Sequence, residues 1–378
     1  MNGPAMDISR PITLHLPKRI EIGNGAAARL SDWAAPYGRV LVLASRSTAA
    51  MVDRLGLPGT VTVHAPVAAE PKDTDLMAAL AAARAVRPDL VVGFGGGSVM
   101  DIAKLVAVLW DSDQTPAEVG GANLVRRKCS ALAQVATTAG TGSEAGIRAL
   151  FTASDSGMKV AVESPLTIAD VAVLDPELTM TVPQATTAAT GVDALAHCVE
   201  AFTSRRAHPL VDDYARLGIG LTGRFLARAV ADGADAEARS GMLLASFYGG
   251  LCLGPVNTAA GHAVAYPLGT RAGLPHGLAN ALVFPHVLAF NAPACPEKTA
   301  AIMDLLGLGA TSDPGEVLAR AGDYCRSLGI DMALRSHGIS AGALPGWAAE
   351  AHGIRRLMDQ NPREMSVGDV EAIYRAAF

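Results

Sequence analysis

The sequence predicts a protein of two domains, an α/β domain with a parallel sheet over residues 1–181 and an all-α domain over residues 182–378. Three observations support this. A chain of 378 residues, 50% of them hydrophobic, is long enough to build two cores. In the first half, short β-branched runs alternate with alanine-rich stretches, which is typical of parallel strands joined by helices. In the second half, Ala, Leu, Glu and Arg recur at helical spacing without a comparable strand.

The predicted strands are short apolar runs bounded by turn residues. They span residues 40–43, 60–63, 90–94, 132–136 and 171–174. A further extended run, residues 12–16, suggests an N-terminal strand through which two copies could pair, so a homodimer is expected.

Helical spacing is clearest over residues 185–202, 210–231 and 235–251, and it continues to the end of the chain. Thr181 precedes Pro183 and Gln184, which fits an N-cap with a capping box and an early proline. The second domain is therefore expected to begin near Thr181.

Composition excludes several classes of function. Charged residues make up 18% of the chain and the formal net charge is -5, so nucleic acid is not an expected partner. Residues 1–10 lack an apolar run behind a basic patch, and no stretch has the length of a membrane helix, so we expect a cytoplasmic protein that does not enter a membrane. The five cysteines are scattered and never form a Cys-x-x-Cys pair, which indicates reduced thiols.

A glycine-rich loop follows the strand predicted at residues 90–94. It consists of Gly95, Gly96, Gly97 and Ser98 and leads directly into a predicted helix. Backbone without side chains can approach a phosphate, and the dipole of the helix favours negative charge, so the loop is a candidate pyrophosphate cradle. A tight strand-to-helix turn explains the glycines as well, and the spacing is not Gly-x-Gly-x-x-Gly.

A second loop, residues 137–144, follows the strand predicted at 132–136 and is rich in Thr, Ser and Gly. The carboxyl ends of parallel strands meet at one edge of a sheet, where ligands bind. Two such loops could therefore bracket one dinucleotide, although the second could also be a polar turn.

Four potential metal ligands lie in the second half. Asp193 and His197 are four residues apart, hence on one face of a helix, and His262 and His276 follow in glycine-containing segments. Three imidazoles and a carboxylate suit divalent iron or zinc. Taken singly, each residue could instead be a satisfied histidine or one half of a hydrogen-bonded pair on a helix surface.

Four motifs together resemble the iron-containing alcohol dehydrogenases. They are Gly95-Gly-Gly-Ser-x-x-Asp101-x-x-Lys104, Thr137-Thr-Ala-Gly-Thr-Gly-Ser-Glu144, Gly191-Val-Asp-Ala-Leu-Ala-His197 and Pro275-His-Gly-Leu-Ala-Asn280, and the resemblance extends over most of the chain. It implies a dinucleotide-binding α/β domain and a helical metal-binding domain, an architecture shared with dehydroquinate synthase, with the active site in the cleft between them.

The resemblance also implies roles for individual residues. Asp193, His197, His262 and His276 match the metal ligands, and His262, His276 and Tyr266 match positions that take part in catalysis. Lys159 matches a lysine that approaches the nicotinamide ribose. The other positions that match the cofactor site are Ser45, Gly95, Gly96, Gly97, Ser98, Asp101, Thr137, Thr138, Thr141 and Ser143.

Two positions depart from the family pattern. Many members carry a histidine where this chain has Tyr266, whose phenol can exchange hydrogen bonds but is a weaker base than imidazole. Protons could pass through Tyr266, water or the cofactor ribose, and Tyr266 could also simply pack beside Pro267. Many relatives that prefer NAD have an aspartate after the strand predicted at 40–43, where this chain has Ser45 and Arg46. We expect NAD, with NADP as the alternative, since no carboxylate repels a 2′-phosphate.

The resemblance implies a metal-dependent oxidoreductase that moves a hydride between NAD(P) and a small alcohol, aldehyde or ketone, with Fe²⁺ or alternatively Zn²⁺. Residues 287–295 are reminiscent of maleylacetate reductases, but those enzymes usually carry paired histidines where this chain has Gly261 before His262. An acidic substrate would need a basic pocket, for which Arg148 or Arg271 is a candidate. A lyase of the dehydroquinate synthase type and a metal-free nucleotide-binding protein are the remaining alternatives.

Overall fold

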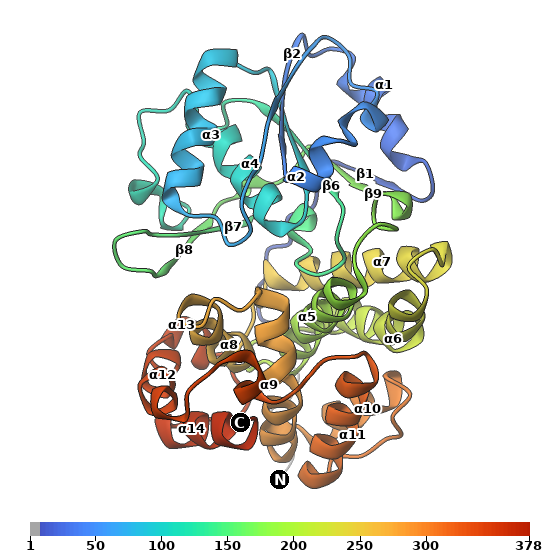
Figure 1. Cartoon of the computed structure of the whole chain (residues 1–378), viewed down its shortest axis with the longest axis vertical. Helices are drawn as coiled ribbons and strands as arrows, with labels where there is room; N and C mark the ends of the chain where they lie inside the picture. Colours follow the sequence, from blue (N-terminus) through green and yellow to red (C-terminus); the bar gives the residue numbers. More distant parts are fainter. Residues whose placement is uncertain (1–7) are drawn as a thin grey trace. The chain divides into compact units, whose positions relative to one another are not determined.

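The computed structural model describes residues 8–378, which form two compact units. One unit spans Leu14–Val182 and is built on a sheet, and the other is helical and comprises Pro183–Phe378 together with the described residues up to Thr13 (Figure 1). The guanidinium of Arg10 donates a hydrogen bond to the carbonyl of Arg206, which ties the first described residues to the helical unit.

The sheet of the first unit has six strands, and every neighbouring pair is parallel. The predicted parallel α/β architecture is therefore confirmed. In spatial order the strands are β1 (Arg19–Ile22), β9 (Val171–Leu174), β6 (Ala131–Ala136), β4 (Leu90–Gly95), β2 (Arg39–Ala44) and β3 (Thr60–His64).

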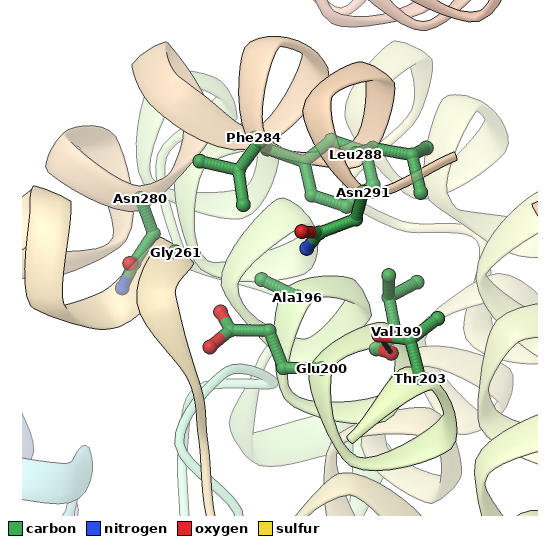
Figure 2. A pocket seen from close by; sticks show the side chains of 10 residues that line it. Ala196, Val199, Glu200, Thr203, Gly261, Asn280, Phe284, Leu288 and Asn291 are labelled. Carbon is green, nitrogen blue, oxygen red and sulfur yellow. Dashed lines mark hydrogen bonds between the residues drawn. The ribbon is translucent and has the colours of Figure 1, made fainter. Parts of the chain in front are cut away.

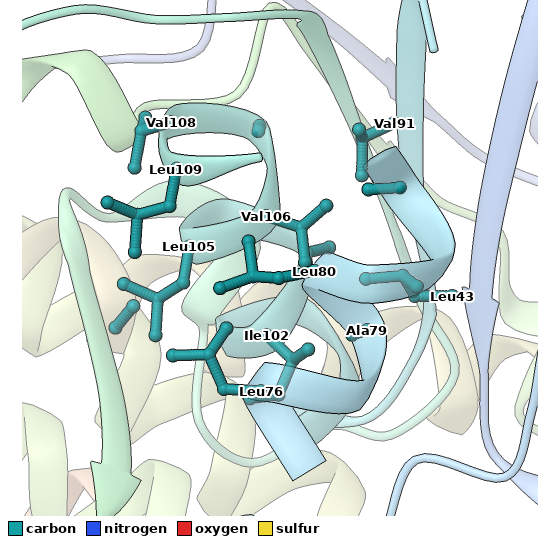
Figure 3. Packing of buried hydrophobic residues seen from close by; sticks show 14 of the residues in the cluster. Leu43, Leu76, Ala79, Leu80, Val91, Ile102, Leu105, Val106, Val108 and Leu109 are labelled. Atoms are coloured by element: carbon teal, nitrogen blue, oxygen red, sulfur yellow. The ribbon is translucent and has the colours of Figure 1, made fainter. Parts of the chain in front are cut away.

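Both faces of this sheet are buried, which explains why its central strands are mostly apolar. Leu41 and Leu43 of β2 face a core that includes residues of α3 (Asp73–Val86) and α4 (Gly97–Leu109). Figure 3 shows Leu76 and Leu80 packing with α4 in this core. The alternate residues of β2 face a second core that includes residues of α1 (Leu30–Ala34), and α2 (Arg46–Ala49) follows β2.

A second, smaller sheet was not predicted. It contains β5 (Gly121–Ala122), which is parallel to β8 (Lys159–Glu163), and β7 (Arg148–Thr152), which is antiparallel to β8. Buried residues alternate with partly exposed ones along β7, and β8 has one buried residue, so no continuous apolar run marks these strands in the sequence. The strand predicted at residues 12–16 is wrong, because these residues lie outside every described strand. Pro11 and Pro17 flank this segment, and neither has an N–H to donate to a sheet.

The second unit consists of helices and their connections, and residues 183–378 contain no strand. Its central helix, α5, has buried residues around most of its circumference and packs against α6, α7, α8 and α9. The helices are α5 (Gln184–Thr203), α6 (Pro209–Ala231), α7 (Ala236–Leu253), α8 (Ala260–Thr270), α9 (His276–Asn291), α10 (Pro296–Leu305), α11 (Pro314–Ser327), α12 (Leu344–His352), α13 (Arg355–Met358) and α14 (Val367–Ala376).

The N-cap predicted at Thr181 for the first helix of this half is wrong. Thr181 lies in a turn, and α5 begins three residues later, with Pro183 at the N-cap and no side-chain capping hydrogen bond. The residue before a proline avoids helical backbone, which keeps Val182 outside the helix. Across residues 8–378, the helices all fall short of the length and apolar character that crossing a membrane requires.

Candidate functional site

Three helices of the second unit bring four predicted metal ligands together. Asp193 and His197 lie on one face of α5, His262 lies in the first turn of α8, and His276 is the first residue of α9. Each offers one ligand atom, and these atoms all lie within 4.8 Å of one another. Residues separated by as many as 83 positions thus form one compact cluster of potential metal ligands.

The distances within this cluster fit one metal ion. The Nε2 atoms of His262 and His197 are 2.9 Å apart. The Oδ1 atom of Asp193 lies 3.5 Å from Nε2 of His262 and 3.7 Å from Nε2 of His276. Ligand atoms arranged tetrahedrally at about 2.1 Å from a metal ion are separated by about 3.4 Å. The four residues therefore fit a divalent ion in both donor chemistry and spacing.

The electrostatics of the cluster also suit a cation. Burial lowers the pKa of His197 to about 4, so this imidazole is neutral at pH 7, the form that binds a metal ion. Burial alone would raise the pKa of Asp193, but the neighbouring histidines, His197 and His276 foremost, hold it well below its usual value. Burial likewise opposes charge on His262, yet the carboxylates of Glu200 and Asp193 outweigh it and raise its pKa to about 10.

A glycine and an asparagine on α9 place His276. A Cβ added at Gly277 would lie 2.9 Å from the carbonyl oxygen of Ala189, so glycine is needed where α9 meets α5. One turn later, Nδ2 of Asn280 donates to Oδ1 of Asp193 at 2.7 Å and lies 3.2 Å from Nε2 of His276. Asn280 therefore links the ligand on α5 to the ligand on α9.

The cluster is accessible at His276. Its side chain is 27% exposed, whereas those of Asp193 and His262 are 2% and 3% exposed. The ring of Tyr266 lies 6.1 Å from that of His276, measured between centroids. The guanidinium of Arg356 donates to the Tyr266 hydroxyl at 3.3 Å. A phenol and a cation thus lie beside the accessible ligand.

The two predicted cofactor loops are neighbours in the first unit. They follow β4 and β6, which are adjacent parallel strands, so both loops leave the same edge of the sheet. A Cβ added at Gly96 would lie 3.0 Å from Oγ1 of Thr138, and one added at Gly97 would lie 2.5 Å from Cγ2 of Thr141. The first loop needs glycine because the threonines of the second loop pack against its backbone.

The start of α4 has the properties of an anion site. Its N-cap is Gly96, which provides no side-chain hydrogen bond to the first N–H groups of a 13-residue helix. These groups and the helix dipole favour a negatively charged ligand such as a pyrophosphate. The N–H of Thr137, the first residue of the second loop, donates to the Gly95 carbonyl at 3.0 Å and so joins the starts of the two loops.

Other residues predicted to bind the cofactor form hydrogen bonds or ion pairs within the protein. The Ser143 hydroxyl donates to Asp101 at 2.6 Å, and the N–H of Leu150 donates to the other carboxylate oxygen at 3.0 Å. Asp101 therefore connects α4 to the second loop and to β7. Ser98 accepts a hydrogen bond from the N–H of Glu70, and the carboxylate of Glu70 is paired with Lys159.

Ser45 caps the short helix after β2. Its hydroxyl accepts from the N–H of Thr48 at 3.2 Å, and the hydroxyl of Thr48 donates to the carbonyl of Phe94 at 2.8 Å. The loop after β2 is thereby fixed to the end of β4. Arg46, which follows Ser45, is exposed.

The sequence did not predict the roles of three residues around the metal cluster, Glu200, Asn280 and Arg356, although Asn280 lies in one of the four motifs. Glu200 lies seven residues after Asp193 and three after His197, so helical spacing alone places it on their face of α5. Asn280 follows His276 by one turn, which is a similar signal. Nothing local in the sequence marks Arg356, because it reaches Tyr266 across 90 positions.

Comparisons with known proteins identify the family of this chain. Residues 17–176 match the family model described as iron-containing alcohol dehydrogenase, and residues 187–378 match the model of the C-terminal domain of that family. Long-chain-alcohol dehydrogenase 1 of Geobacillus thermodenitrificans is 37% identical over 84% of this chain and 82% of its own length. The 1,3-propanediol dehydrogenase of Klebsiella pneumoniae is 34% identical over 84% of this chain and 83% of its own length.

Solved structures share the fold. The crystal structure of a 1,3-propanediol oxidoreductase superposes with a TM-score of 0.93 at 30% identity and covers 98% of this chain and 100% of its own. Sulfoacetaldehyde reductase from Bifidobacterium kashiwanohense, in complex with NAD+, has a TM-score of 0.86 at 26% identity and covers 98% and 99% of the two chains. This chain is therefore an oxidoreductase and belongs to the iron-containing alcohol dehydrogenase family.

Proposed function

We propose that the enzyme transfers a hydride between a nicotinamide dinucleotide and a small alcohol, aldehyde or ketone, and that Asp193, His197, His262 and His276 hold a divalent metal ion. The observation that carries the proposal is the convergence of these four ligand atoms within 4.8 Å. Fe²⁺ is the ion that the family suggests, with Zn²⁺ as the alternative. When bound, such an ion supplies Lewis-acid polarisation of the substrate oxygen.

Each unit has its own part in this proposal. The helical unit binds the metal, and the substrate approaches beside His276, the one ligand of the four that is not buried. The Leu14–Val182 unit binds the dinucleotide, with the pyrophosphate at Gly95, Gly96, Gly97 and Ser98. We propose NAD as the cofactor because sulfoacetaldehyde reductase, a structural neighbour, has been crystallised with NAD+. NADP is the alternative because the exposed Arg46 could bind a 2′-phosphate.

Tyr266 is the proposed proton donor. Its hydroxyl accepts a hydrogen bond from Arg356, so its own proton remains available to the substrate oxygen. The same guanidinium would stabilise the phenolate that remains after transfer. We also propose a cytoplasmic location, since the free thiols of the described residues suit a reducing compartment. We further propose a homodimer, and light scattering would measure the oligomeric state.

Purified protein is expected to contain about one metal ion per chain and to oxidise NADH, or alternatively NADPH, with neutral aldehydes, because the four ligands and the glycine loop together support hydride transfer. Elemental analysis and absorbance at the nicotinamide band measure both properties. Chelation should remove the activity, and added Fe²⁺ or Zn²⁺ should restore it. Cofactor binding without oxidation in metal-loaded protein would favour the lyase or the nucleotide-binding alternative instead.

A second candidate function is the reduction of an aldehyde or ketone that carries an acidic group. Arg356 favours it, because this exposed guanidinium lies beside Tyr266 and forms no ion pair within residues 8–378. The two arginines predicted for such a pocket are both engaged. Arg148 pairs with Glu163 at 2.8 Å, and Arg271 pairs with Glu350 at 2.9 Å.

Replacing Arg356 with glutamine tests this candidate. We expect the ratio of kcat/KM for an acidic aldehyde to kcat/KM for a neutral aldehyde of similar size to fall about tenfold, the order expected when a hydrogen bond to a charged group is lost. Losing the hydrogen bond to Tyr266 should change kcat/KM for both substrates equally, so the ratio is not affected by it. Arg335→Gln, at an exposed position of the same unit, is the control. An unchanged ratio in Arg356→Gln would rule out this role.

A further inference from the structure

We infer that Glu200, which is not one of the four ligands, is a positioning residue of the metal centre that orients His262. This inference rests on the proposed metal function. Oε1 of Glu200 lies 2.7 Å from Nδ1 of His262. An imidazole held at Nδ1 has only Nε2 left for a metal ion. In this structure Nε2 of His262 lies 2.9 Å from Nε2 of His197, within the cluster of ligand atoms.

The same carboxylate holds the main chain that carries His262. Its second oxygen accepts hydrogen bonds from the N–H groups of Ala259 and His262. Ala259 is the N-cap of α8 and has no capping side chain of its own. Glu200 therefore caps α8 from a neighbouring helix, where the N-terminal end of the helix dipole favours a negative charge. One residue fixes both the ring and the backbone of a predicted ligand.

Gly261 leaves the space that this arrangement requires. A Cβ added there would lie 2.6 Å from Oε1 and 3.1 Å from Cδ of Glu200. Figure 2 shows the Glu200 carboxylate directed toward the chain at Gly261. Glycine at position 261 thus makes room for the carboxylate.

The surroundings of Glu200 strengthen these hydrogen bonds. The residue is 6% exposed and lines a small cavity together with apolar side chains that include Ala196, Val199 and Leu288 (Figure 2). A hydrogen bond to a carboxylate is stronger in apolar surroundings than in water, and the cost of leaving that carboxylate unpaired is higher. Carboxylates that accept from the second nitrogen of a metal-bound histidine commonly contribute about 10- to 100-fold to metal affinity.

The test measures metal affinity directly. Metal-free wild-type enzyme, Glu200→Gln and Gly261→Ala are titrated with Co²⁺ and with Zn²⁺, and their dissociation constants and the Co²⁺ absorption spectra are compared. Glutamine has one carbonyl oxygen in place of two carboxylate oxygens, so it cannot accept all three hydrogen bonds. We expect affinity about 10- to 100-fold weaker in Glu200→Gln, a changed Co²⁺ spectrum, and a loss in the same direction in Gly261→Ala.

Asp212→Asn is the matched control. Asp212 is a buried carboxylate of the same unit that pairs with Lys298 at 2.7 Å and is not part of the ligand cluster, so its replacement should leave the metal dissociation constant unchanged. The melting temperatures of the metal-free proteins are recorded as well. A lower melting temperature with wild-type metal affinity in Glu200→Gln would overturn the positioning role, because it would mean that Glu200 only stabilises the fold.

The two proposals can fail separately. If the wild-type enzyme binds neither metal, the proposed metal function is wrong. If the wild-type enzyme binds metal and turns over, but Glu200→Gln has the same dissociation constant and spectrum, only the positioning role is wrong.

Discussion

Replacing His262 with alanine is expected to abolish metal retention and to lower kcat/KM by about a thousandfold or more, while the binding of NAD(P)H is unchanged. Nε2 of His262 lies 2.9 Å from His197 and 3.5 Å from Asp193, so removing it opens the cluster on two sides. Lewis-acid stabilisation contributes several kcal/mol to such reactions, and each ~1.4 kcal/mol is a tenfold change in rate. Elemental analysis, steady-state kinetics and nicotinamide fluorescence measure the three effects.

Two further variants separate the loss of metal from the loss of fold. His262→Ala also leaves the buried carboxylate of Glu200 without a partner, which can destabilise the protein by itself. His276→Ala avoids this, because the His276 side chain is 27% exposed, and it should lose metal and activity as well. His337→Ala is the control, since the ring of His337 forms a hydrogen bond with the backbone carbonyl of Asp331 and lies outside the ligand cluster. Full turnover in metal-free His262→Ala would refute the proposed mechanism.

Replacing Gly97 with alanine is expected to weaken NAD(P)H binding about 10- to 100-fold and to leave metal content unchanged. The new Cβ would lie 2.5 Å from Cγ2 and 2.6 Å from Oγ1 of Thr141, so the two cofactor loops must separate or distort. Overpacking of this kind costs about 1–3 kcal/mol, which corresponds to the expected loss of affinity. Fluorescence titration with NADH and NADPH measures the dissociation constants.

A second substitution checks that this steric contact is the cause. Thr141→Ala removes both close atoms, so the double variant Gly97→Ala/Thr141→Ala should regain part of the lost affinity. Gly38→Ala is the matched control within the same unit, because its Cβ would meet only Asp89, at 3.7 Å. Normal cofactor affinity in Gly97→Ala would remove the glycine loop from the proposed binding site.

The parts of the site that could be predicted are those that a local pattern carries. The four-residue spacing of Asp193 and His197 places both on one face of α5, and the glycines of residues 95–97 follow directly on a strand. Glu200 has the same helical signal, yet a glutamate on a helix is usually a solvated residue. Only its burial and its contact with His262 distinguish it.

Other features have no local signal. Asp101 was predicted to lie at the cofactor, and nothing in the sequence indicated that Ser143 and Leu150 would occupy both of its oxygens. The strands β7 and β8 were missed because their partly exposed residues give no continuous apolar run. The segment 12–16 looked extended, but a strand needs a neighbour with which to exchange hydrogen bonds.

The sequence by itself determined the class of each half, the parallel sheet and the helical unit, because hydrophobic periodicity is a local property of the chain. It also determined which residue types were available to bind a metal ion and a pyrophosphate. The tertiary structure decided that α5, α8 and α9 bring Asp193, His197, His262 and His276 within 4.8 Å, and that Glu200 holds one of them. Such contacts join residues more than 60 positions apart, and they depend on packing between helices that no single segment encodes.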